Sequence, residues 1–248
     1  MSSFYQIAPN LSISDNPNFG NYYREIVHDL LLSVDTNFSS ALNIPPFSTR
    51  NCIIEYRDEG PMCSNIAGVH FIFLHVTGNS FQQWLYQFSH EYCHHLINGK
   101  MTSSIYGLMW FEETVCDLAS LYQLHTIYNQ WSTHSNQIKK ALSPTFREYL
   151  SLYLPEHKQL FSATHHPGFL SLWEQILFEP KYHRDHYNAI ATKMFPLFVE
   201  NPSLWKMILY FGDMRNWNSL SDLFEHLHQT ADDSYSKSLS DLEKLLLS

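Results

Sequence analysis

Residues 81–100, FQQWLYQFSHEYCHHLINGK, decide how the rest of the chain is interpreted. Ser80 and Gln83 fit the capping box that begins a helix, and Gly99 fits the glycine that ends one. Together they predict a helix over residues 80–98. The apolar residues on one side of that helix are Phe81, Leu85, Phe88 and Tyr92. This side is predicted to pack in a core.

His90, Glu91 and His94 fall on another side of the same helix. At 100° per residue, His94 lies about 40° and Glu91 about 100° from His90. Two histidines four residues apart can bind one metal ion, with the glutamate beside it as a general base. The spacing therefore predicts a metal site that faces a cleft. In a chain with 15 histidines, however, HExxH arises by chance about once in twenty chains.

A third ligand makes the prediction more specific, because catalytic zinc sites use three protein ligands and keep one position open. A second helix is predicted over 107–128, and FEETVCD within it offers Glu113, with 18 residues between it and His94. Asp117 falls about 40° from Glu113 on this helix. We expect Glu113 to bind the metal and Asp117 to accept a hydrogen bond from a histidine ligand.

Three nearby residues are alternative candidates for a metal ligand. Glu112 points about 100° away from Glu113 and has Cys116 rather than an acid four residues on. We therefore favour Glu113 as the ligand. Cys93 and Cys116 each point about 60° from the main ligand of their own helix, so packing is the expected role of both thiols.

The motif HEYCHH, the 18-residue gap and EETVCD resemble the gluzincin metallopeptidases, the group of thermolysin and aminopeptidase N, whose pattern is HExxH-x18-ExxxD. The resemblance covers residues 90–117. It implies one Zn²⁺ per chain, with His90, His94 and Glu113 as the metal ligands. Glu91 corresponds to the general base of that family, and Asp117 to the partner of the first histidine.

The same resemblance implies that a tyrosine or histidine from the C-terminal half stabilises the oxyanion. The densest candidate stretch is PKYHRDHYNA, residues 180–189, in which Tyr182 and His183 are the predicted catalytic residues. Tyr106 and the stretch THHPG, residues 164–168, stay open as alternatives.

The remaining pattern predicts an α+β fold. A helix is expected within residues 20–43, and strands at 52–57 and 68–77 with a loop between them. After about residue 135 we expect only helices, broken by prolines at 144, 155, 167, 180, 196 and 202. The expected domains are a zincin-like half, residues 1–130, and an all-helical C-terminal subdomain, residues 131–248.

These features predict a zinc metallopeptidase that acts on a peptide or protein substrate held along an exposed sheet edge. The resemblance to aminopeptidases implies a glycine-rich loop ending in Met-Glu-Asn, whose glutamate binds a free N-terminus. The stretch GPMCSNIAG has no such glutamate, which favours an endopeptidase or a peptidase of undefined mode. Two alternatives stay open. One is a degenerate zincin that serves as a zinc-containing binding or regulatory module. The other is a structural helical protein in which the motif is accidental.

The composition of the chain argues against two classes of binding partner. The net charge is -9 and no run of five or more basic residues occurs, so we expect neither nucleic acid nor an anionic membrane as a partner. With no signal peptide or long apolar segment visible, we expect a cytoplasmic protein, although export without an N-terminal signal stays open. The pattern does not predict the oligomeric state.

Overall fold

The computed structural model of the 248-residue chain describes residues 3–98, 107–154, 159–179, 182–217 and 219–248. The chain forms two compact units, and each takes two separate segments of sequence. The first unit comprises Met1–Leu96 and Ala119–Ser151, and the second comprises Ile97–Leu118 and Leu152–Ser248. The position predicted to separate two domains, near residue 130, falls inside a helix.

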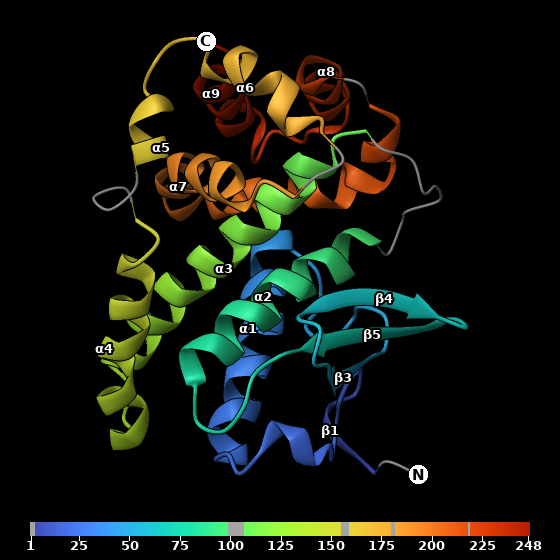
Figure 1. Cartoon of the computed structure of the whole chain (residues 1–248), viewed down its shortest axis with the longest axis vertical. Helices are drawn as coiled ribbons and strands as arrows, with labels where there is room; N and C mark the ends of the chain where they lie inside the picture. The colour runs from blue at the N-terminus through green and yellow to red at the C-terminus, as the bar shows by residue number, and fades with distance from the viewer. Residues whose placement is uncertain (1–2, 99–106, 155–158, 180–181, 218) are drawn as a thin grey trace. The chain divides into compact units, whose positions relative to one another are not determined.

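The first unit contains a mixed five-stranded sheet in the order β1-β2-β3-β5-β4 (Figure 1). Its strands are β1 (Phe4–Ala8), β2 (Leu11–Ser14), β3 (Cys52–Tyr56), β4 (Met62–Ile66) and β5 (Val69–Leu74). β2 and β5 both run parallel to β3, while β1 and β4 pair antiparallel at the two edges. The α+β class is therefore confirmed.

Helix α1 (Arg24–Leu42) connects β2 to β3, as a parallel pair requires a long crossover. The β4–β5 hairpin turns through Ala67 and Gly68, whose φ angles are 53° and 83°. Two successive positive φ values are typical of the turn that matches the twist of a hairpin. The segment predicted as a loop, DEGPMCSN, thus contains an edge strand from Met62 onward. That prediction was wrong because β4 is short and polar.

Helices α2 (Phe81–Asn98), α3 (Met109–Ser132) and α4 (Gln137–Ser151) complete the first unit, which takes only the second part of α3. The two predicted helices, 80–98 and 107–128, correspond to α2 and α3. The Ser120 hydroxyl donates to the carbonyl of Tyr86 at 2.8 Å, joining α3 to α2. Gln87 exchanges two 2.9 Å hydrogen bonds with the backbone of His75 just after β5, which fixes α2 against the sheet.

The apolar sides predicted for α2 and α3 are buried, but their polar sides are largely buried too. On α3, Thr114, Asp117, Ser120 and Gln123 all have no exposed surface. A helix that is buried all round lies inside the protein rather than along its surface. The expectation of one open polar face therefore holds only for part of each helix.

Among its described residues the second unit is helical throughout. Besides the first part of α3 it contains α5 (Gln159–Ala163), α6 (Phe169–Leu177), α7 (Arg184–Glu200), the 3-10 segment η3 (Pro202–Asn216), α8 (Leu220–Thr230) and α9 (Ser236–Leu247). Pro144 and Pro196 lie inside α4 and α7, so these two prolines do not break helices as predicted. The packing of neighbouring residues on each helix overrides the local penalty of the proline.

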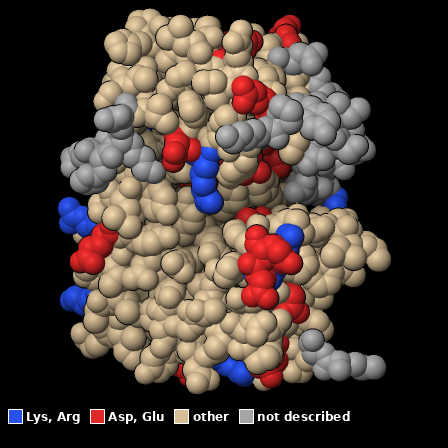
Figure 2. All heavy atoms as spheres, viewed as in Figure 1, with Lys and Arg blue, Asp and Glu red and all other residues tan. Residues whose placement is uncertain are grey.

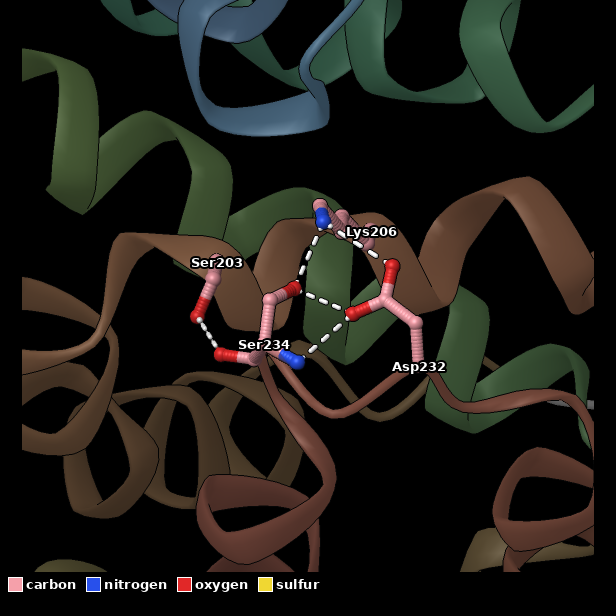
Figure 3. Close-up of polar contacts among 4 residues, drawn as sticks. All are labelled: Ser203, Lys206, Asp232 and Ser234. Carbon is pink, nitrogen blue, oxygen red and sulfur yellow. Dashed lines mark hydrogen bonds and ion pairs between the residues drawn. The ribbon is translucent and has the colours of Figure 1, made fainter.

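The turn between α8 and α9 is fixed to η3 by a polar cluster (Figure 3). Lys206 Nζ lies 3.1 Å from Asp232 Oδ2 and 2.6 Å from Ser234 Oγ. Ser203 Oγ donates to the carbonyl oxygen of Ser234 at 3.2 Å. Within the same unit, Phe198 and Trp205, both fully buried, meet at a ring-centroid distance of 4.9 Å. The polar cluster therefore fixes the turn between α8 and α9 to η3.

Candidate metal centre

Helix α2 carries His90, Glu91 and His94. The two imidazole rings are 5.0 Å apart between centroids, as expected for residues one helical turn apart. His90 and Glu91 are buried, with 6% and 4% of their surfaces exposed, and His94 is half-buried. The helix is held locally by Ser89 Oγ, which donates to the carbonyl of Leu85 at 2.6 Å. The three side chains therefore project from a rigid element.

Helix α3 carries the carboxylates predicted to complete the site. Thr114 Oγ1 donates to the carbonyl of Trp110 at 2.8 Å within the first turns of the helix. Farther along, the contact between Ser120 and Tyr86 fixes the separation of α3 from α2. Glu113 itself lies in the part of α3 before Ala119, which belongs to the second unit.

His90, His94 and Glu113 form a group in which one potential ligand atom from each residue lies within 4.8 Å of the others. Ligands of a tetrahedral zinc ion at about 2.0–2.2 Å are roughly 3.4 Å apart. Ligand atoms grouped this closely are compatible with one shared ion. Two imidazoles and one carboxylate are a donor set of catalytic zinc sites. The residues therefore fit the ion that the sequence predicts.

The other two acids of α3 occupy different positions. Glu112 is buried and is not a member of the group around His90 and His94. Asp117 has no exposed surface, and its Oδ1 lies 3.7 Å from Nη2 of Arg184. An arginine from the start of α7 therefore compensates a buried carboxylate. The predicted hydrogen bond between Asp117 and a histidine ligand stays a prediction.

Tyr182 and His183 have different neighbours. The Tyr182 hydroxyl donates to Glu113 Oε2 at 2.9 Å. The pKa of Tyr182 is raised, chiefly by desolvation and then by the nearby Glu113 and Asp117. Because 47% of the residue is exposed, solvent screens part of these effects. His183 instead pairs through Nε2 with Glu179 Oε2 at 3.0 Å. Among the described contacts, Tyr182 is hydrogen-bonded to the predicted ligand Glu113, whereas His183 contacts none of the predicted ligands.

The other oxyanion candidates are not joined to the group by described contacts. Tyr106 lies outside the described residues. His165 and His166 lie in the turn between α5 and α6, where His165 meets the ring of Phe161 at 4.8 Å. Cys93 and Cys116 are buried, and Cys52 is a buried thiol whose pKa is raised by desolvation. These cysteines are consistent with the packing role expected from the sequence.

A second histidine pair was not predicted. His95, the residue after His94, places Nδ1 3.3 Å from Nδ1 of His70 on β5. Nε2 of His70 lies 3.3 Å from Arg50 Nη1. The pKa of His70 is lowered, chiefly by burial and secondly by the charge of Arg50. The pKa of His95 is lowered to about 4, chiefly by burial and secondly by His70. The only signal in the sequence was the polar residue at position 70, within an otherwise apolar strand.

A buried polar network lies beside this pair. The Tyr92 hydroxyl donates to Asp35 of α1 and lies 3.1 Å from the Thr49 hydroxyl. The backbone amide of Phe47 donates to the same aspartate at 2.9 Å. Burial and the nearby Asp35 raise the pKa of Tyr92. The network fixes α2 to α1 on the side of the helix away from His90.

Comparisons with known proteins found no family model, no curated protein and no solved structure that matches this chain. None of its described helices is both long and apolar enough to span a membrane. On the face seen in Figure 2, Lys and Arg are scattered among uncharged residues rather than gathered into a basic patch.

Proposed function

We propose that this protein is a zinc-dependent metallopeptidase. The observation that carries the proposal is the group of His90, His94 and Glu113, with ligand atoms within 4.8 Å of one another. These residues come from two helices, α2 and α3. The spacing in the sequence and the group in the structure point to the same three side chains.

Bound zinc would supply Lewis-acid chemistry that polarises the scissile carbonyl and lowers the pKa of water. His90, His94 and Glu113 would hold the ion. Glu91 would accept a proton from the attacking water and deliver it to the leaving amine. Its position directly after His90 on the helix aims it beside the ligands rather than among them. Its burial, with 4% of its surface exposed, keeps bulk water from competing for that proton.

The substrate class is a peptide or protein, and internal cleavage is the favoured mode. The predicted edge-binding of an extended substrate would fall on β4, because β5 is inside the sheet between β3 and β4. This strand contains Asn65 and Met62 but no acid that could pair with a free amino terminus. An exopeptidase of the aminopeptidase type would need such an acid.

A zinc-containing binding or regulatory module is the second candidate. Tyr182 favours it, because the hydroxyl expected to stabilise an oxyanion is already hydrogen-bonded to Glu113. Catalysis needs a donor aimed at the developing charge. A module of this kind would bind zinc and peptide without cleaving the peptide.

The test is to measure metal content and peptide cleavage for wild type and Glu91→Gln. Wild type should contain about one zinc ion per chain and cleave an internally quenched peptide library. Glu91→Gln should retain zinc and lose about 10²- to 10⁴-fold in kcat. Zinc without cleavage in wild type would select the binding module. A native protein that takes up no zinc would contradict both functions.

A further inference from the structure

Residues 182–184 contact two carboxylates of the same helix. Tyr182 donates to Glu113 at 2.9 Å, and Arg184 lies 3.7 Å from Asp117. Glu113 and Asp117 are one turn apart on α3, and all four residues belong to the second compact unit. This short segment therefore constrains the two acids from one side.

The two contacts differ in what they can do. Arg184 is 48% exposed and faces a carboxylate with no exposed surface, so it chiefly offsets the charge of Asp117. Tyr182 approaches one oxygen, Oε2, of a half-buried carboxylate. A hydrogen bond to one oxygen of a carboxylate ligand restricts its side-chain torsions and so orients the carboxylate.

We propose that Tyr182 is a positioning residue that orients Glu113 for metal binding, in place of the oxyanion-stabilising role suggested by the sequence. The inference rests on the proposed zinc site but not on peptidase activity. A hydroxyl that donates to the ligand carboxylate acts on metal affinity in the resting protein. An oxyanion donor would instead act only on the transition state.

The ring contacts of Tyr182 provide a matched control. Its ring meets that of Tyr187 edge to face, with centroids 5.2 Å apart. Tyr182→Phe and Tyr187→Phe each remove one hydroxyl from the same aromatic pair and preserve both rings. Only the first removes the described hydrogen bond to Glu113. A loss caused merely by disturbing the aromatic pair would appear in both variants.

The experiment measures the dissociation constant of zinc for the full chain by competition with a chromophoric chelator. Tyr182→Phe should weaken zinc binding about 10- to 100-fold, the usual effect of removing a partner of a metal ligand. Tyr187→Phe should stay within about two-fold of wild type. The visible spectrum of the cobalt-substituted protein should change in Tyr182→Phe alone, because the coordination by Glu113 changes.

A double-mutant cycle provides a second measurement. In a Glu113→Gln background, Tyr182→Phe should cause no comparable further loss of affinity, because the ligand that it orients is gone. Equal zinc affinity in wild type and Tyr182→Phe overturns the inference, and a lower kcat at that unchanged affinity would restore the oxyanion role. If wild type binds no zinc, the proposed function and this inference both fail.

Discussion

Two pairs of histidines meet on or beside α2 at the same distance, yet their surroundings differ. The rings of His90 and His94 are 5.0 Å apart between centroids, and so are those of His70 and His95. The first pair has Glu113 within reach of both imidazoles. The second has the Arg50 guanidinium at 3.3 Å from His70. A carboxylate attracts a cation to a histidine pair, whereas a guanidinium repels one.

The difference shows that two adjacent residues, His94 and His95, can serve separate purposes. They point about 100° apart on the helix, so each contacts a different part of the protein. His95 is 2% exposed and bonded to another imidazole, an arrangement that needs at least one neutral ring. Histidine content alone therefore does not identify a metal site, and the charge of the nearest neighbour is a further criterion.

The largest expected effect is the loss of zinc on removing a ligand from the first pair. His94→Ala should lower zinc affinity by more than the 10- to 100-fold that a supporting residue contributes, about 10³-fold or more. His70→Gln removes an imidazole from the second pair and should leave about one zinc ion per chain. Metal analysis after dialysis measures both. Equal zinc loss in the two variants would show that the pairs are not distinct.

A smaller effect should appear in stability at acid pH. The pKa of His95 is about 4 in the folded protein, below the ordinary value of 6.5, so the unfolded chain binds the proton first. This contribution is complete above about pH 6.5 and is lost as pH falls toward 4. It amounts to at most about 3 kcal/mol.

Urea unfolding of the metal-free protein between pH 7 and pH 4 tests this dependence. The free energy of unfolding should fall more steeply with decreasing pH in wild type than in His95→Gln, which cannot gain the proton. Metal-free protein is needed because zinc binding has a pH dependence of its own. If the free energy of unfolding depended on pH in the same way in both proteins, His95 would not be the cause of the dependence.

The smallest effect concerns Arg50. Replacing it with methionine removes the charge that lowers the pKa of His70, so this pKa should rise. It should stay below its ordinary value, because burial is the larger cause and remains. NMR titration of the His70 ring protons measures the shift. Arg57→Met is the matched control, since Arg57 pairs with Glu59 instead. If Arg50→Met left the pKa of His70 unchanged, the charge of Arg50 would not distinguish the second histidine pair from the first.

Local patterns in the sequence were sufficient to predict the two helices that carry the candidate site. The apolar period and end signals around Phe81 and Asn98 predicted α2, and the same period predicted α3. The strands β1, β2 and β4 were missed because they are short, and β2 also pairs with a distant strand, as Leu11 does with Cys52. Pairing of this kind stabilises a strand without leaving a local signal.

The contacts around the site could not be predicted for a related reason. Tyr182 was selected from the density of aromatic and histidine residues, but its partner Glu113 is 69 residues away in the chain. His70 and His95 are 25 residues apart and meet only because β5 and α2 pack together. Sequence spacing identifies residues that share a helix face, whereas such contacts depend on how separate elements pack.

Helix α3 has a consequence for how the protein is made. Its first residues, through Leu118, belong to one compact unit, and those from Ala119 onward belong to the other. The first unit therefore cannot be completed until Ser151 has been synthesised. At about 5–20 residues per second, its first 96 residues wait roughly 3 to 11 s for the segment that completes their core. During this interval the strands of the nascent sheet lack the helical segment, Ala119–Ser151, that completes their unit.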